Sequence, residues 1–175
     1  MSVLLTEKDV FPWAERVLKG RITASTRQGG RESGGRPGWF VELEGANGGA
    51  RYYIRGDRGG DFGFIHEYGL AREVRLLKLL REEGIPVPEV IASSAEPNAA
   101  ILGFVEGVND FTLIESAAER DAVARDFARI MARWHAIPAE KFAEIGLCVP
   151  VNAEQLVGQD LAVWERGHFP LISEP

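Results

Sequence analysis

The sequence predicts an α+β fold, in which an antiparallel sheet of about five strands carries one packed helix. Two observations indicate this class. Short strand-like runs are joined by glycine-rich turns, and their order lacks the alternating β-α-β repeat of a parallel sheet. An amphipathic segment at residues 64–83, ended by Gly84, Pro86 and Pro88, then supplies the helix that would pack on the sheet.

The elements of this sheet region follow in chain order. Residues 12–19 indicate a short helix, with Pro12 in its first turn and Gly20 just past its end. A glycine-rich loop at 28–38 and a hairpin turn at 45–49 separate the first strands. The strands that we expect are residues 21–26, 39–44, 51–55, 89–92 and 99–102.

Helical periodicity dominates the rest of the chain. Ser116 and Glu119 form a capping box that opens a helix, which Pro138 closes. Its apolar residues recur at helical spacing and are Val123, Phe127, Ile130, Met131 and Trp134. We expect this helix to expose apolar surface and to allow self-association. The predicted organisation is a sheet domain at 1–104, a linker at 105–115 and a partial helical domain at 116–175.

Composition excludes several classes of protein. The chain has 175 residues, 45% of them hydrophobic and 26% charged, as in ordinary globular proteins. A formal net charge of -6 argues against nucleic acid or an anionic membrane as partner. No apolar run approaches bilayer-spanning length, and Cys148 has no second cysteine with which to form a disulfide. We therefore expect a cytoplasmic protein.

One charge is out of place on the helix at residues 64–83. At about 100° per residue its apolar side chains form one arc, and Glu73 falls inside that arc. The arc contains Leu70, Val74, Leu76, Leu77 and Leu80, whereas Leu79 falls on the polar side. A carboxylate among leucines is costly unless a cation meets it. Because Arg55 ends the strand just before this helix, we expect it to pair with Glu73.

The order of these parts is similar to that of a known family. The matching segments are Gly34-Gly35 before residues 39–41, the strand end Tyr53-Ile54-Arg55, and residues 72–77, 84–90, 105–107 and 134–138. Together they extend from about Arg21 to Leu147. In this order and spacing the chain resembles the amino-terminal lobe of the aminoglycoside phosphotransferase family. That family has a protein-kinase-like fold, so the helices after the linker would begin a truncated helical carboxy-terminal lobe.

The resemblance implies a nucleotide site between the two lobes. Arg55 would contact the phosphates of ATP, and Glu73 would hold Arg55 through their ion pair. Lysine is the commoner residue at the position of Arg55, but arginine keeps the charge and can bind a phosphate through two nitrogens. The loop containing Gly34 and Gly35 would cover the phosphates, since glycine allows close backbone approach.

The resemblance also implies an adenine site at the end of the sheet domain. Leu102 would gate the cleft, and the segment Gly103, Phe104 and Val105 would be the hinge whose backbone binds adenine. Gly103 replaces the acidic residue that is usual in the family. The expected reaction is transfer of the γ-phosphoryl group of ATP, with magnesium, to the hydroxyl of an unidentified small molecule.

The catalytic loop of that family does not occur in this sequence. The loop carries a His-Gly-Asp motif followed by an asparagine and a metal-binding aspartate, yet no aspartate lies two residues after His66, His135 or His168. The tripeptide at residues 61–63 spells Asp-Phe-Gly, but it precedes the helix of Glu73 and is interpreted as loop. We expect the chain to be roughly half of a phosphotransferase, with catalytic and metal-binding residues in the other half, and to be inactive by itself.

Two other functions fit the same residues. A non-catalytic nucleotide-binding or scaffolding domain would use the same sheet and helix without transferring phosphate. An unrelated α+β ligand-binding domain would share only the order of the motifs. In that second case a five-stranded antiparallel sheet with a packed helix would not be required. Separately, the pair of Arg55 and Glu73 has a purely structural ion pair as its alternative interpretation.

Overall fold

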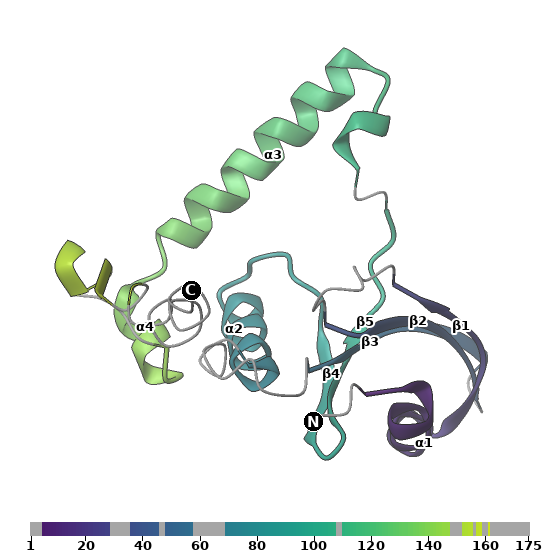
Figure 1. Cartoon of the computed structure of the whole chain (residues 1–175). Helices are drawn as coiled ribbons and strands as arrows, with labels where there is room; N and C mark the ends of the chain where they lie inside the picture. Colours follow the sequence, from purple (N-terminus) through teal and green to yellow (C-terminus); the bar gives the residue numbers. More distant parts are fainter. Residues whose placement is uncertain are drawn as a thin grey trace, which may run out of the picture.

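The core of the protein is a five-stranded antiparallel sheet with strand order β1-β2-β3-β5-β4 (Figure 1). The computed structural model describes residues 5–28, 36–45, 48–57, 69–107, 110–147, 152–155, 157, 158 and 161. The strands are β1 (Gly20–Arg27), β2 (Gly38–Gly45), β3 (Gly48–Gly56), β4 (Val90–Ala95) and β5 (Asn98–Gly103). All the predicted strands form, and the predicted fold class is confirmed.

Two helices, α1 (Glu7–Leu18) and α2 (Leu70–Glu82), cover opposite faces of this sheet (Figure 1). Side chains alternate along a strand, so neighbouring residues of β5 point to different helices. The buried cluster on the α1 face consists of Val10, Trp13, Ala14, Trp39, Val41, Ile54, Ala99 and Ile101. The cluster on the α2 face consists of Leu70, Val74, Ala100 and Leu102. The structure thus adds a second packed helix to the one that was predicted.

Helix α1 begins earlier than predicted. Its N-cap is Thr6, and Asp9 accepts hydrogen bonds from the Thr6 backbone amide at 2.8 Å and the Thr6 hydroxyl at 2.7 Å. Pro12 consequently lies inside the helix and not in its first turn, so the predicted start was wrong. The overlooked signal was a capping box in which Asp9 stands where glutamate or glutamine is usual.

Helix α2 is shorter than predicted, and one of its leucines was assigned to the wrong side. The helix begins at Leu70 because Gly69 is an extended N-cap, with φ -60° and ψ 162°. Residues 64–68 of the predicted helix lie outside the described residues. Leu79 is only 6% exposed, whereas its position in the arc predicted a polar environment. The reason is that α2 contacts α4 as well as the sheet, so it buries side chains on more than one side.

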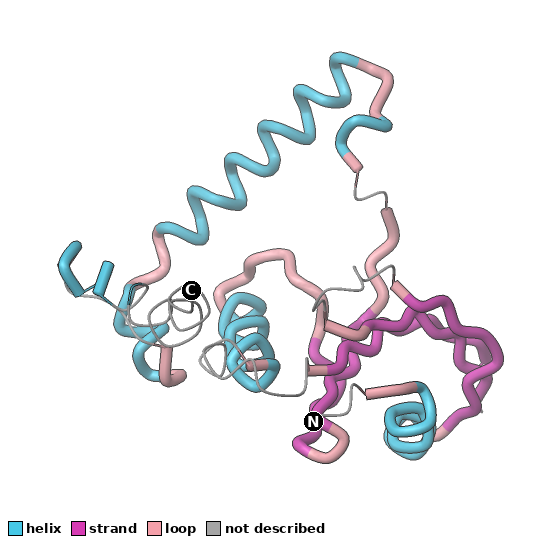
Figure 2. The backbone as a smooth tube through the Cα atoms, in the orientation of Figure 1, coloured by secondary structure: helices cyan, strands magenta, loops and turns pink. Residues whose placement is uncertain are grey.

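The chain becomes helical beyond β5 (Figure 2). The elements are the 3-10 helix η2 (Phe111–Leu113), α3 (Ala117–His135) and α4 (Ala139–Glu144). Ser116 caps α3 as predicted, accepting a hydrogen bond from the Glu119 amide at 3.3 Å. Figure 1 shows α3 leading away from the sheet, and none of its residues is buried. The expected exposure of apolar surface is therefore present, with Phe127 at 65%, while self-association stays a prediction.

Two polar contacts join the helical part to the carboxy-terminal end of α2. Lys141 of α4 pairs with Glu83, the C-cap of α2, and Arg133 of α3 donates from Nη2 to the carbonyl oxygen of Gly84. The proposed division at residues 104 and 116 stays a prediction. Within the described residues, no helix has both the length and the apolar character that crossing a bilayer requires.

Candidate functional site

The α2 face of the sheet carries charged side chains at one end. Arg55 is the next-to-last residue of β3, where it lies opposite Gly38 of β2 and Ala100 of β5. These small neighbours leave room for a long side chain. Glu73 stands in the first turn of α2, which packs on this same face. Arg55 thus reaches Glu73 from the sheet, and Glu73 reaches Arg55 from the helix packed on that face.

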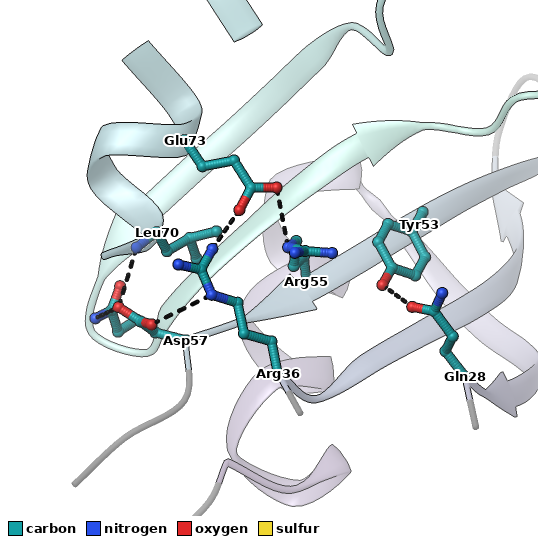
Figure 3. A network of polar contacts seen from close by, with 8 residues as sticks. Gln28, Arg36, Tyr53, Arg55, Asp57, Leu70 and Glu73 are labelled. Atoms are coloured by element: carbon teal, nitrogen blue, oxygen red, sulfur yellow. Dashed lines mark hydrogen bonds and ion pairs between the residues drawn. The ribbon is translucent and has the colours of Figure 1, made fainter. Parts of the chain in front are cut away.

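The ion pair predicted from the sequence is present (Figure 3). Nε of Arg55 lies 3.0 Å from Oε1 of Glu73, and the two side chains are 31% and 29% exposed. That nitrogen is buried and has no aligned hydrogen bond among the described residues, so charge attraction holds the pair. Because Nε faces Glu73, this contact does not use the far edge of the Arg55 guanidinium, formed by Nη1 and Nη2. This edge has the geometry that binds phosphate through two nitrogens.

Glu73 has a second cationic partner that the sequence analysis did not identify. Nη1 of Arg36 contacts the other carboxylate oxygen, Oε2 (Figure 3). The Arg36 side chain is only 10% exposed. It lies two residues before Gly38, the first residue of β2 and the ladder partner of Arg55. Arg36 and Pro37 are outside the strand, as the predicted loop at residues 28–38 implied, so no strand pattern in the sequence pointed to Arg36.

Asp57 holds the other side of Arg36. Its Oδ1 lies 3.9 Å from Nε of Arg36, and its Oδ2 accepts hydrogen bonds from the Leu70 backbone amide at 3.2 Å and from Nδ2 of Asn98 at 3.0 Å. Leu70 is the first residue of α2, where a carboxylate is favoured by the helix dipole. Asp57 therefore ties Arg36 to the end of β3, the start of α2 and the β4–β5 hairpin.

The backbone that presents Arg36 is itself fixed to β3. The Gly56 amide donates a hydrogen bond to the carbonyl oxygen of Pro37 at 2.8 Å. A Cβ atom at Gly56 would lie 2.8 Å from Cγ of Pro37, so the close approach of these two segments requires glycine. Arg36 is consequently delivered to Glu73 by a defined contact between two chain segments.

An open pocket of about 520 Å³ lies on the same face, toward the other end of β3. Its lining includes Phe40, Arg51, Phe104 and Val105. The Phe40 and Phe104 rings meet edge to face with centroids 5.8 Å apart, and the Arg51 guanidinium lies 4.3 Å from the centre of the Phe104 ring. Aromatic surface beside an open pocket of this volume suits a flat heterocyclic ligand.

Tyr53 occupies the space between this pocket and Arg55. Its ring lies 4.9 Å from that of Phe40, and its hydroxyl donates a hydrogen bond to Gln28 (Figure 3). A Cβ atom at Gly38 would clash with this hydroxyl. The glycine at this strand start therefore makes room for a tyrosine. Each strand residue advances by about 3.3 Å, so the four steps from Arg51 to Arg55 separate the pocket from the charged cluster of Arg36, Arg55, Asp57 and Glu73 by about 13 Å.

Of the residues predicted to bind adenine, Phe104 and Val105 line this pocket, whereas Leu102 and Gly103 do not. Leu102 is 6% exposed and packs against α2. The Gly103 amide donates a hydrogen bond to the Glu89 carbonyl at 2.8 Å, so that donor is used within the sheet region. Val105 is 64% exposed and lines the pocket. A ligand in the pocket would consequently meet Phe104 and Val105 before the Gly103 amide.

Several predicted residues lie outside the described residues. They are Gly34 and Gly35 of the loop, the tripeptide at 61–63, and two of the histidines, His66 and His168. In the part of the chain that the structure describes, no group of three or more His, Cys, Asp or Glu side chains is arranged to hold a metal ion.

Comparison with known proteins supports a single family. The model of the phosphotransferase enzyme family matches residues 41–151. This segment includes β3, α2 and the predicted hinge, and therefore Arg55 and Glu73. A comparison with the curated proteins finds no match.

Proposed function

Because the chain belongs to the phosphotransferase enzyme family, we propose that it supplies the nucleotide-binding half of an ATP-dependent phosphotransferase. The observation that carries this proposal is the arrangement on one face of the sheet, where the Arg55–Glu73 ion pair shares a surface with an open aromatic pocket. The complete reaction would transfer the γ-phosphoryl group of ATP to the hydroxyl of a small molecule.

The base of the nucleotide would occupy the pocket of Phe40 and Phe104. A volume of about 520 Å³ is in the range of small-molecule sites. The aromatic rings would stack on the purine, and the backbone near Val105 would supply hydrogen bonds to its edge. In this proposal the hinge still binds adenine, but the hydrogen bonds come from the backbone near Val105 and not from the Gly103 amide.

The phosphates would reach the charged end of the same strand. Arg51 and Arg55 are roughly 13 Å apart along the strand, so a nucleotide that reaches both sites would bind in an extended form. The far edge of the Arg55 guanidinium would bind phosphate oxygens, while Glu73 fixes the near edge. The predicted cover of Gly34 and Gly35 would close over them.

Phosphoryl transfer needs groups beyond these. Magnesium, when bound, would neutralise phosphate charge, but the described residues provide no ligand set for it, and we assign no metal-dependent step to them. The sequence contains no His-Gly-Asp motif from which to take a base. We therefore propose that the 175-residue chain binds ATP without transferring its phosphate.

The proposal is tested by thermal unfolding of the full chain with ATP, adenosine or no ligand, each with and without magnesium. ATP at about 100 times its Kd is expected to stabilise the chain by about 2.7 kcal/mol, which raises Tm on the order of 5 °C. Arg55→Ala is expected to lose most of the gain from ATP and to keep the gain from adenosine.

The matched control is Arg129→Ala. Arg129 pairs with Asp126 on the exposed face of α3, where its side chain is 73% exposed, so this variant is expected to respond to ATP as the unmodified chain does. Absence of any ATP-dependent shift in the unmodified chain at millimolar ATP would refute the nucleotide assignment. Equal ATP responses in the unmodified chain and Arg55→Ala would refute the role of Arg55.

A further inference from the structure

The charged cluster consists of Arg36, Arg55, Asp57 and Glu73. Arg36 is the arginine that the predicted pair of Arg55 and Glu73 did not include. Glu73 is shared between two guanidinium groups, with Oε1 at Arg55 and Oε2 at Arg36. These arginines differ in environment, because the Arg36 side chain is 10% exposed and that of Arg55 is 31% exposed. The less exposed Arg36 contacts Asp57 and Glu73, while Arg55 reaches solvent on the face that carries the pocket.

Arg36 also contacts a second carboxylate. Its Nε lies 3.9 Å from Asp57, and its Nη1 contacts Glu73, so a single planar group spans both acids. Asp57 is in turn held by the Leu70 amide and by Asn98. An unbroken chain of contacts therefore runs from the start of α2 through Asp57 and Arg36 to Glu73, and ends at Arg55.

The charges in this series of contacts affect how Arg55 is presented to a ligand. Were Arg55 the sole partner of Glu73, the carboxylate would neutralise it and would repel phosphate from the same spot. With Arg36 at Oε2 and Arg55 at Oε1, the Glu73 carboxylate is held on both sides, and part of its charge is met away from Arg55. Asp57 shares the charge of Arg36, so the two arginines and two carboxylates balance, and the effect of Arg36 on a ligand is through the position of Arg55.

We propose that Arg36 is a positioning residue for the phosphate end of the nucleotide site. It bridges Asp57 and Glu73, fixes the Glu73 carboxylate, and thereby orients Arg55 so that the far edge of its guanidinium faces the phosphates. The inference rests on the proposed function, since it assumes that Arg55 binds phosphate. In this role Arg36 acts through Glu73 and does not touch the nucleotide.

Calorimetric titration of the full chain with ATP and with adenosine tests this role. The ratio of the two affinities isolates the part of binding that depends on phosphate. Arg36→Gln is expected to reduce that ratio about tenfold, the usual worth of a charge-assisted contact, and to leave adenosine affinity unchanged. In a Glu73→Gln background the same substitution is expected to have less than half that effect on a logarithmic scale, because its route to Arg55 is gone.

Two further variants separate position from charge. Arg36→Lys keeps the charge, but a single ammonium cannot span both carboxylates, so it is expected to lose affinity for ATP nearly as Arg36→Gln does. It also carries the test if Arg36→Gln fails to fold. Arg81→Gln removes a positive charge from the exposed Arg81–Glu89 pair at the end of α2 and is expected to leave the ratio unchanged.

The outcomes distinguish this inference from the proposed function. An unmodified chain that binds neither ATP nor adenosine would overturn both. An unmodified chain that binds ATP, combined with an equal loss from Arg36→Gln in the presence and absence of Glu73, would overturn only the positioning role and would indicate direct contact with phosphate. Full ATP affinity in Arg36→Lys would also overturn it, since the bridge would then be unnecessary.

Discussion

The two faces of the sheet are built from the same strands but differ in chemistry. The α1 face is an apolar core in which Trp39, Ile54 and Ile101 are at most 1% exposed. The α2 face has a smaller apolar cluster, and the rest of it carries the arginine–carboxylate network and an open pocket. The α1 face thus contributes mainly to stability, whereas the α2 face buries fewer apolar side chains and keeps polar and aromatic groups accessible.

Alternation along β2 and β3 makes this division possible. Trp39 and Phe40 are consecutive, yet Trp39 packs under α1 at 1% exposure while Phe40 lies at the pocket at 40% exposure. Ile54 and Arg55 are divided in the same way. Because the side-chain period of a strand is two, a stable core and a functional surface can be changed nearly independently.

Trp39→Ala is expected to have the largest effect. It removes a buried ring that meets Phe11 edge to face at 6.1 Å, and the cavity left under α1 cannot close fully. The expected loss in the free energy of unfolding is about 4 kcal/mol, measured by urea denaturation followed by tryptophan fluorescence or circular dichroism.

Phe40→Ala is the matched control on the other face. Its ring is partly exposed, so the expected loss in the free energy of unfolding is about 1 kcal/mol, whereas affinity for adenosine is expected to fall because a stacking ring is lost. Similar losses of stability from the two substitutions would contradict the division of the sheet into a stabilising and a functional face.

The sequence predicted the sheet well because its signals are local. Strand patterns and the helix stop at Gly84 depend on near neighbours, and the strands and this stop are confirmed. Gly45 pairs with Gly48 across the predicted hairpin, while residues 29–35 and 46–47 of the glycine-rich turns lie outside the described residues. The pair of Arg55 and Glu73 could also be predicted, since a carboxylate in an apolar arc demands a cation and few cations lie close in the chain.

The rest of the candidate site depends on contacts that sequence patterns do not carry. Arg36 reaches Glu73 through the packing of Pro37 on Gly56 and through Asp57, which is held by residues far along the chain. Leu79 is buried although the wheel placed it on the polar side, and α2 contacts α4 as well as the sheet. Long-range packing decides such positions, and a single helical wheel cannot.

Gly56→Ala tests how far the two faces are coupled. Gly56 is buried at the end of β3, and an added Cβ would lie 2.8 Å from Cγ of Pro37 and 3.2 Å from Cδ1 of Leu5. Leu5 packs against the α1 face, and Pro37 is the chain neighbour of Arg36, whose side chain contacts Glu73 on the other face. We expect a loss of about 2 kcal/mol in the free energy of unfolding, together with weaker ATP binding from the displacement of Arg36.

Gly49→Ala is the control on the same strand. Its added Cβ would meet only the Leu43 carbonyl oxygen, at an ordinary 4.0 Å, so little change in stability or ATP affinity is expected. Thermal unfolding and calorimetric titration measure the two effects. Loss of stability in Gly56→Ala without loss of ATP affinity would mean that the faces are independent even at this edge.

Asp9→Asn is expected to have the smallest effect, confined to the α1 face. Hydrogen bonds from the hydroxyl and then the amide of Thr6 hold the pKa of Asp9 below its usual value. A carboxyl whose pKa is lower in the folded chain stabilises folding above the unfolded pKa of about 4. This contribution is lost as pH falls further through the folded pKa. The difference in Tm between the unmodified chain and Asp9→Asn should therefore be present at neutral pH and shrink in acid, with ATP affinity unchanged at neutral pH.

Asp110, whose pKa is lowered in the same way by Thr112, precedes η2 outside the sheet, so Asp110→Asn should not alter the unfolding of the sheet. Equal changes in Tm from the two substitutions would show that the cap of α1 has no special part in holding that helix on its face.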